Sequence, residues 1–320
     1  MKNTPWLIVG AGAIGLFWAC KLQALGHKVH LVYRSENPGK KITLDSLPDT
    51  TEQNESIRSE HKIKSFTAQK LLEQDSIENY NKVMLCTKSF DLKSAFLQIA
   101  SKVSEDANIA CLCNGIGAQD ELQNTLSENQ TLWAGVTSEG VLKLDSNHVK
   151  HTGLGDTYFG QWTPTDPARI FPLSHLTVAN IHQKIIEKLA VNATINPMTA
   201  LFSMHNGDIL NEEYKPLLEA ITDELAGVFS HSKFDYVEQS QHLTSDNLKN
   251  RVNTIAQLTR LNRSSMYEDI RQDRPTENEF ISGFLIKNSP IELPIQKLLY
   301  NGIAFPEQRE ESKKKLLSLT

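Results

Sequence analysis

Hydrophobic and polar residues follow two different patterns along this chain. In the first half, short continuous apolar runs are bounded by glycines and polar residues, which is typical of strands buried in a parallel sheet. These runs occupy residues 6–10, 28–33, 82–86 and 108–113. From residue 181 onward apolar positions recur with a helical period, in residues 181–195, 217–229, 248–261 and 280–286. The pattern predicts an α/β domain over residues 1–179 and an all-α domain over residues 180–320.

Two regions of the first half do not fit the buried-strand pattern. Residues 132–144 and 148–162 alternate apolar and polar positions around glycines, so we expect antiparallel hairpins that close the sheet and have a structural role. Residues 38–61 are polar and rich in turn-forming residues, so we expect a mobile surface excursion and assign it no chemistry.

A glycine-rich turn follows the first apolar run and precedes an apolar helix that ends at Gly26. In this order of strand, turn and helix, the first glycine permits a tight turn, the second lets backbone approach a pyrophosphate, and the third lets the helix pack on the strand. The helix N-terminus then faces the phosphates. The sequence therefore predicts a Rossmann-type dinucleotide site with the loop Gly10, Ala11, Gly12, Ala13, Ile14 and Gly15.

The second strand ends on Arg34, where an enzyme specific for NAD usually presents an acid to the ribose 2′-hydroxyl. A guanidinium at this position favours a 2′-phosphate, so NADP is the expected cofactor. Two alternatives stay open: Glu36 could reach the ribose, or Arg34 could be an ordinary surface residue.

Polar residues also follow the next two strands. Lys88 comes shortly after the run 82–86, and Asn114 comes directly after the run 108–113. Ligands bind beyond the carboxyl ends of the strands in an open parallel sheet, so we expect both side chains to face the same crevice as the glycine loop. On spacing alone, a solvated lysine and a turn asparagine explain them equally well.

The polar residues of the helix predicted after residue 181 line up along one side. Lys184, Lys188, Asn192 and Asn196 are spaced four apart and form one stripe on an otherwise apolar helix. A solvated helix face explains such a stripe, but asparagine lowers helix stability and is better explained where its amide meets a partner. The stripe is therefore a candidate wall of a ligand cleft. Because Asn196 precedes Pro197, we expect one helix to end there and another to begin.

Composition narrows the classes of function. The chain has 320 residues, 39% of them hydrophobic and 22% charged, which suffices for a sizeable core. A net charge of −5 offers no electrostatic footprint for nucleic acid or anionic membrane, so a small molecule is the expected partner. The four cysteines lie in apolar runs without metal-ligand spacing, and no apolar stretch is long enough for a signal or a membrane span. We therefore expect reduced cysteines, no metal and a cytoplasmic location.

Several more specific motifs occur in the second half and join those already described. They are Lys188-Leu-Ala-Val-Asn192, Asn196-Pro197, Asn206-Gly207, Ser264-Ser265-Met266 and Thr276-Glu277. With the glycine loop, Lys88 and Asn114-Gly115, they make the chain resemble the ketopantoate reductase (2-dehydropantoate 2-reductase) family from residue 6 to about residue 310. The resemblance implies a Rossmann domain followed by a helical domain similar to the C-terminal domain of 6-phosphogluconate dehydrogenase.

The resemblance also implies an activity, namely NADPH-dependent reduction of ketopantoate to pantoate on the route to pantothenate and coenzyme A, with the active site between the two domains. Lys188 matches the family's general acid, which protonates the C2 oxygen as hydride arrives. Asn114 matches a residue that assists there and contacts the cofactor, and Glu277 matches an acid that contacts a substrate hydroxyl and the lysine. Ser265 matches a residue that binds the substrate carboxylate. The family's amides around the substrate hydroxyls correspond to Asn192, Asn196, Asn206 and Asn262.

Alternatives remain for individual residues and for the whole chain. Thr276 and Glu279 have the spacing of a capping box, in which case Glu277 simply favours the helix dipole, and Asn206-Gly207 fits a bare turn. A related NADP-dependent reductase of another 2-oxo acid, or a non-catalytic NADP-sensing protein, would share the fold and the cofactor loop. The expected assembly is a monomer or a homodimer.

Overall fold

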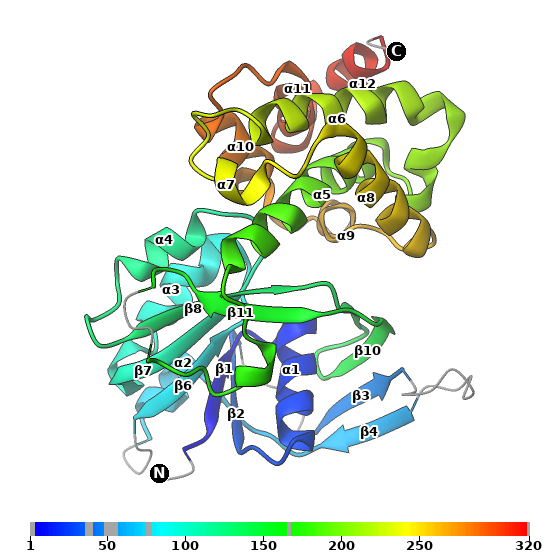
Figure 1. The fold of residues 1–320 in the computed structure, drawn as a ribbon. Coiled ribbons are helices and arrows are strands. Elements are labelled where there is room, and N and C mark those ends of the chain that lie inside the picture. Colours follow the sequence, from blue (N-terminus) through cyan, green and yellow to red (C-terminus); the bar gives the residue numbers. More distant parts are fainter. Residues whose placement is uncertain (1–3, 36–40, 48–56, 75–78, 165–167, 319–320) are drawn as a thin grey trace. The chain divides into compact units, whose positions relative to one another are not determined.

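The computed structural model describes residues 4–35, 41–47, 57–74, 79–164 and 168–318 (Figure 1). The chain forms two units. Residues 1–113 and 118–181 make up the N-terminal unit, and residues 114–117 and 182–320 make up the C-terminal unit. The segment 114–117 thus packs with the C-terminal unit, although it follows a strand of the N-terminal one. The sequence did not indicate this exchange, and the domain boundary between residues 179 and 180 stays a prediction.

A seven-stranded sheet forms the centre of the N-terminal unit, as the apolar runs predict. Its order is β11-β8-β7-β6-β1-β2-β5, and every neighbouring pair is parallel except β8 and β11. The strand order reverses at β1, which pairs with β2 on one side and β6 on the other, so the carboxyl end of β1 is the switch point of the sheet. The strands are β1 (Trp6–Val9), β2 (Val29–Tyr33), β5 (Lys64–Thr67), β6 (Tyr80–Leu85), β7 (Val103–Leu112), β8 (Thr131–Thr137) and β11 (Thr157–Gln161).

The described part of this unit contains the α-helices α1 (Ala13–Ala24), α2 (Ala68–Leu72), α3 (Leu92–Leu97) and α4 (Ala118–Gln123). Helix α1 follows β1 directly and contacts both β1 and β2. It is apolar on nearly all sides, because its other side is covered by a second sheet.

The second sheet has the order β4-β3-β10-β9, with β3 (Ile42–Ser46), β4 (Ile57–His61), β9 (Gly140–Lys143) and β10 (His148–Gly153). Ile42, Leu44 and Val149 are buried in the same hydrophobic cluster as the residues of α1. Asp45 accepts a hydrogen bond from Arg58 Nε at 2.7 Å and contacts His148 Nε2 at 2.8 Å. The bond from Arg58 and the contact with His148 lower the pKa of Asp45 to about 2, against the opposing effect of burial.

The structure corrects two expectations in this region. The described part of residues 38–61 contains strands β3 and β4 rather than a surface excursion, because Ile42 and Leu44 alternate with polar residues and bury one face. Residues 38–40 and 48–56 lie outside the described residues. Strands β8 and β11 do close the main sheet, whereas β9 and β10 form a hairpin of the second sheet. Alternation identified these strands but not the sheet to which each belongs.

The described part of the C-terminal unit contains helices and no strand, as predicted. The helices are α5 (Ile181–Phe202), α6 (Lys215–Phe229), α7 (Val237–Ser240), α8 (Ser245–Leu258), α9 (Ser265–Arg271), α10 (Ser282–Asn288), α11 (Pro294–Ala304) and α12 (Arg309–Leu317), with α5 beginning in the N-terminal unit. Across the residues that the structure describes, no helix is both long and apolar enough to cross a membrane.

Helix α5 runs without interruption past Pro197, so the expected break between Asn196 and Pro197 is wrong. Proline has no N–H, and the carbonyl of Ala193, four residues earlier, loses its helical donor. Gln296 Nε2, at the start of α11, donates to this Ala193 oxygen at 3.1 Å, and both residues are fully buried. The carboxylate of Glu224 fixes the start of α11 by accepting from the backbone N–H groups of residues 295 and 296, at 2.8 and 2.7 Å. An amide from another helix thus replaces the missing donor.

We expect Gln296→Met to lower the free energy of unfolding by about 1–2 kcal/mol, because the buried Ala193 carbonyl then has no donor. In a Pro197→Ala background the same substitution should cost little, because the introduced alanine supplies the helical N–H. Urea unfolding of the wild type, both single variants and the double variant measures the coupling. An equal cost in both backgrounds would contradict this account of the helix.

Candidate active site

The glycine loop joins β1 to α1 at the switch point of the main sheet. Gly10 has a φ of +103°, and a Cβ there would lie 2.8 Å from the carbonyl oxygen of Cys86. A Cβ at Gly15 would lie 1.8 Å from the Gly10 oxygen, so the first turn of α1 packs directly on the loop. A Cβ at Gly12, by contrast, would meet no atom closer than the Cys86 oxygen at 3.9 Å, so backbone is exposed there to an approaching group.

The start of α1 suits an anion. Gly12 is the N-cap and has no side chain to bond the first N–H groups, and the first turn contains no acidic residue. Backbone N–H groups and the helix dipole at such an end favour phosphate. The residues of the loop therefore fit the pyrophosphate of a dinucleotide.

Arg34 and the segment after Lys88 meet at the carboxyl ends of β2 and β6. The Arg34 guanidinium is largely exposed and forms an ion pair with Asp91. The backbone N–H of Asp91 donates to the Lys88 oxygen at 3.0 Å, which places both basic residues on the same small region of the N-terminal unit. The sequence did not indicate Asp91, because no local pattern identifies which distant acid forms an ion pair with a given arginine. Glu36, the alternative ribose ligand, lies outside the described residues.

Lys188, Asn114 and Glu277 are joined by hydrogen bonds within the C-terminal unit. Lys188 Nζ donates to Asn114 Oδ1 at 2.9 Å, and Asn114 Nδ2 donates to Glu277 Oε2 at 2.7 Å. The backbone N–H of Asn114 also points to Glu277 Oε1, at 3.4 Å. One amide thus holds an ammonium at one end and a carboxylate at the other. The three residues that the sequence proposed for catalysis come together in the structure.

Asn114 reaches this position because the next residue is glycine. Gly115 has a φ of +80°, and a Cβ there would lie 2.1 Å from the carbonyl oxygen of Phe280. The N–H of Ile116 donates to the same oxygen at 3.0 Å. The backbone after β7 therefore packs against the short 3-10 helix η6 (Asn278–Phe280), which directly follows Glu277. Asn114 is more than a turn residue, since its side chain has a partner on each side.

Glu277 is 4% exposed and does not belong to a capping box. Glu279 Oε2 accepts from the Tyr300 hydroxyl at 2.6 Å instead of reaching back, and the Asn278 N–H meets Thr276 Oγ1 only at 3.4 Å. The hydrogen bond to Glu279 and partial burial raise the pKa of Tyr300 to about 12. The capping explanation is therefore wrong, because the Glu277 carboxylate turns toward Asn114.

The members of the polar stripe on α5 have different surroundings. Lys184 Nζ lies 3.5 Å from Glu187 Oε2, and the same carboxylate contacts Arg251 Nη1 at 3.3 Å and His242 Nε2 at 3.1 Å. Burial opposes the charge on Glu187, but Arg251 and Lys184 outweigh it and its pKa lies below the usual value. Lys184 therefore belongs to a structural ion cluster, whereas Lys188 bonds to Asn114.

The two asparagines of the stripe do not lie on a solvated face. Asn192 is only partly exposed and Asn196 is 6% exposed. The apolar residues between them are buried, as the pattern predicts. Thr199 Oγ1 lies 3.2 Å from the Asn196 backbone oxygen and forms a second, shorter hydrogen bond with Ser264 Oγ at 2.7 Å. This second bond ties α5 to the start of α9.

Ser264 caps α9, and its Oγ accepts from the N–H of Tyr267 at 3.1 Å. Ser265 and Asn262 are exposed beside it. The residue type of Ser264 before a helix is a readable capping signal, whereas its contact with Thr199 has no signal in the sequence. Ser264 thus fixes the start of α9, where Ser265 is the first residue.

Asn206 is 8% exposed and begins the 3-10 helix η4 (Asn206–Leu210). Its Nδ2 donates to Thr259 Oγ1 at 2.9 Å, and its backbone N–H donates to the Asn262 oxygen at 2.9 Å. Within the part of the chain that the structure describes, Asn206 Oδ1 is buried and has no hydrogen-bond partner. Asn206 is therefore not an isolated turn residue, because its hydrogen bond holds the Asn262 backbone next to it.

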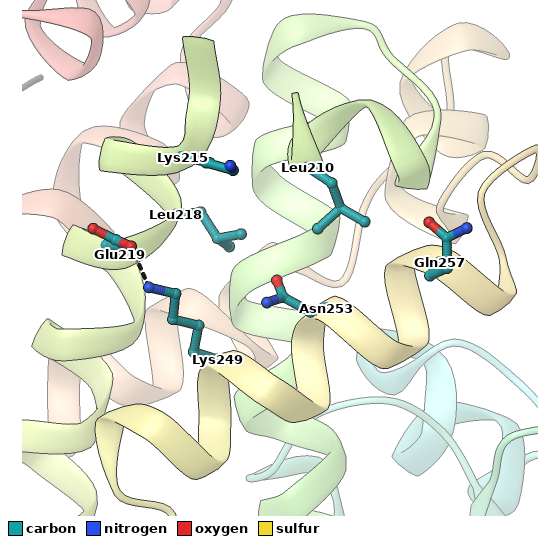
Figure 2. A pocket seen from close by; sticks show the side chains of 7 residues that line it. All are labelled: Leu210, Lys215, Leu218, Glu219, Lys249, Asn253 and Gln257. Atoms are coloured by element: carbon teal, nitrogen blue, oxygen red, sulfur yellow. Dashed lines mark hydrogen bonds and ion pairs between the residues drawn. The ribbon is translucent and has the colours of Figure 1, made fainter. Parts of the chain in front are cut away.

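A groove of about 500 Å³ lies elsewhere in the C-terminal unit, between η4, α6 and α8 (Figure 2). Lys249 forms an ion pair with Glu219 across it, as the dashed line in Figure 2 shows. Its lining residues are Leu210, Lys215, Leu218, Glu219, Lys249, Asn253 and Gln257. None of the residues that the sequence proposed for the site lines this groove.

Asn114→Ala is expected to destabilise the C-terminal unit by about 1–3 kcal/mol, because the buried Glu277 carboxylate loses its side-chain donor. The matched control is Asn288→Ala, which removes an exposed amide bonded to the Phe284 oxygen and should change stability by at most about 0.5 kcal/mol. Urea unfolding measures both. Equal effects of the two substitutions would show that the bond to Glu277 contributes nothing to folding.

Comparison with known proteins places the chain in a family. The family "Ketopantoate reductase PanE/ApbA" matches residues 6–164, and "Ketopantoate reductase PanE/ApbA C terminal" matches residues 180–305. A 2-dehydropantoate 2-reductase from Vibrio cholerae is 27% identical over 313 residues, which cover 94% of this chain and 97% of the relative.

Solved structures show the same fold. A ternary structure of D-mandelate dehydrogenase with NADH and anilino(oxo)acetate has a TM-score of 0.75 and 21% identity, covering 97% of this chain and 99% of that one. A dimeric ketopantoate reductase from Staphylococcus aureus has a TM-score of 0.71 and 21% identity, covering 96% and 99%. The two family matches together span most of the sequence, and the chain therefore belongs to the ketopantoate reductase family of oxidoreductases.

Proposed function

We propose that this protein reduces 2-dehydropantoate (ketopantoate) to pantoate with NADPH, a step toward pantothenate and coenzyme A. The observation that carries the proposal is the hydrogen-bonded chain from Lys188 through Asn114 to Glu277. It provides an acid and a carboxylate, oriented by one amide, in a member of the ketopantoate reductase family. A non-catalytic NADP-sensing protein has no need of this arrangement.

Bound NADPH supplies the hydride that reduces C2 of the substrate. The loop from Gly10 to Gly15 binds the pyrophosphate through backbone N–H groups and the α1 N-terminus. Arg34 and Lys88 bind the 2′-phosphate, which is why NADP is the proposed cofactor. Asn114 contributes to cofactor binding beside its role in catalysis.

Lys188 is the proposed general acid. Reduction of the carbonyl builds negative charge on the C2 oxygen, and the Lys188 ammonium passes a proton from Nζ to that oxygen. Asn114 Oδ1 accepts a hydrogen bond from the same ammonium and so limits its directions. Glu277 holds the other end of Asn114 and accepts a hydrogen bond from a substrate hydroxyl.

Polar residues of the C-terminal unit account for specificity in this proposal. Ser265 binds the substrate carboxylate, and Asn206 offers an acceptor that is unpartnered among the described residues. A substrate without matching hydroxyls leaves such groups unpaired, at about 1–3 kcal/mol each. The proposed amides around the substrate are Asn192, Asn196, Asn206 and Asn262.

A second candidate is reduction of another 2-oxo acid. The structural likeness to D-mandelate dehydrogenase supports it, because that enzyme acts on an aromatic 2-hydroxy acid with the same fold. Purified protein with NADPH and either ketopantoate or phenylglyoxylate, followed by loss of nicotinamide absorbance, distinguishes the two. A higher kcat/KM for phenylglyoxylate would replace the first proposal by the second. For the assembly we propose a monomer or a homodimer, and the Staphylococcus aureus structure supports the latter.

Lys188→Ala is expected to lower kcat by about 10²- to 10⁴-fold, because the developing alkoxide loses its proton donor. NADPH affinity, measured separately by fluorescence, should change little, because the glycine loop and Arg34 belong to the N-terminal unit. Lys184→Ala is the matched control, since this lysine lies on the same stripe but pairs with Glu187. Near-normal kcat in the Lys188 variant would remove the assignment.

Glu277→Gln is expected to impair mainly the use of substrate, through the hydroxyl contact and the orientation of Asn114. Its effect and that of Lys188→Ala should not add in the double variant, because both residues act through the same amide and the same substrate. Steady-state kinetics of the two single variants and the double variant measure this. Additive losses of kcat/KM would show that the residues act independently.

Arg34→Ala is expected to raise the KM for NADPH about tenfold or more and to leave the KM for NADH nearly unchanged, because only NADPH carries the 2′-phosphate. Asp91→Asn should act in the opposite direction, because it removes the carboxylate that pairs with the guanidinium. Equal KM values for the two cofactors in the wild type would contradict the selectivity for NADP.

A further inference from the structure

Lys143 reaches the glycine loop from the second sheet. Its Nζ donates to the backbone oxygen of Ala11 at 2.7 Å, although Lys143 and Ala11 are far apart in sequence. Lys143 is the last residue of β9 and its side chain is exposed. An ammonium therefore stands at the middle of the loop that the proposed function assigns to the pyrophosphate.

A second contact places the β9–β10 hairpin at the same edge of the main sheet. The Tyr33 hydroxyl, at the carboxyl end of β2, donates to Asn147 Oδ1 at 2.6 Å. Asn147 lies in the turn between β9 and β10, and its backbone oxygen accepts from the Thr43 N–H at 2.8 Å. The hairpin is thus tied separately to the glycine loop that follows β1 and to the carboxyl end of β2.

The pairing of β9 with β10 explains why Lys143 points to this loop. Lys143 is opposite Val149, which is fully buried against the α1 side, whereas Leu142 is opposite Lys150 on the other face of the hairpin. Directly opposite residues of an antiparallel pair share one face. The strand register therefore directs Lys143 toward α1 and Lys150 away from it.

We propose that Lys143 is a cofactor-binding residue whose ammonium faces the pyrophosphate bound at the glycine loop. The proposal rests on the proposed dinucleotide function. Open space at Gly12 and the uncapped start of α1 provide the backbone half of the phosphate site, and Lys143 provides the charged half from another part of the chain. The β9–β10 hairpin thereby has a binding role in addition to its structural one.

Lys143 and Arg34 then differ in which cofactor they recognise. The pyrophosphate is common to NADPH and NADH, so loss of the Lys143 charge weakens both by the same factor. Loss of Arg34 weakens only the cofactor with the 2′-phosphate. Lys143 is exposed, so the expected factor is modest, roughly five- to tenfold.

The experiment measures the Kd of NADPH and of NADH by nicotinamide fluorescence at low and at high salt. Lys143→Gln keeps an N–H donor for the Ala11 oxygen and removes the charge, and Lys143→Arg keeps the charge. Lys150→Gln is the matched control, because it makes the same change in charge on the opposite face of the same hairpin. We expect Lys143→Gln to raise the Kd of both cofactors and to make the Kd less dependent on salt. The Kd values should stay close to those of the wild type in Lys143→Arg and in Lys150→Gln.

Three results would overturn the proposal. The first is wild-type affinity in Lys143→Gln, which means that the lysine only supports the loop through Ala11. The second is an equal loss in Lys150→Gln, which means that the effect is that of net charge. The third is a loss confined to NADPH, which assigns Lys143 to the 2′-phosphate. A wild-type protein that binds neither cofactor would instead contradict the proposed function itself, so the two failures are distinguishable.

Discussion

The close approach of the Gly115 backbone to the Phe280 carbonyl is the constraint on which the arrangement of Lys188, Asn114 and Glu277 depends. No side chain fits between them, and the residue that follows completes the contact with a hydrogen bond to the same oxygen. This contact positions Asn114, whose amide bonds to both Lys188 and Glu277. A residue without a side chain thus determines the geometry of three side chains that could do chemistry.

Two neighbouring residues of helix α5, Glu187 and Lys188, bond to different parts of the C-terminal unit. The Glu187 carboxylate contacts Arg251 and His242, and the contact with Arg251 holds α5 against α8. The next residue, Lys188, turns to Asn114. Burying a carboxylate among several donors is tolerable because they offset its desolvation. Because these contacts fix the orientation of α5, they also fix the direction in which Lys188 leaves the helix.

The sequence predicts the parts of this protein whose determinants are local. The apolar runs and the glycine spacing predict the parallel sheet and the loop at the carboxyl end of β1, because burial and backbone geometry are encoded in adjacent residues. The resemblance selects Lys188, Asn114 and Glu277, and the structure brings these three together. Their chemical roles stay a proposal.

The expectations that fail depend on distant partners. Pro197 looks like a helix boundary until Gln296, about a hundred positions later, supplies the missing donor. Glu279 has capping spacing, but the Tyr300 hydroxyl takes its carboxylate. Residues 42–46 look like a polar loop because the helix that buries Ile42 and Leu44 lies earlier in the chain. In each case a contact across the fold overrides a correct local preference.

The bond between Gln296 and the Ala193 carbonyl has a consequence for how this family can vary. A proline within α5 is acceptable only while some donor reaches that carbonyl, and an amide at position 296 has no comparable task once the proline is gone. Position 296 is therefore free to lose its amide once the proline is gone, but not while the proline remains. Positions 197 and 296 should consequently covary among related sequences, which makes a single buried hydrogen bond visible as an evolutionary correlation between two helices.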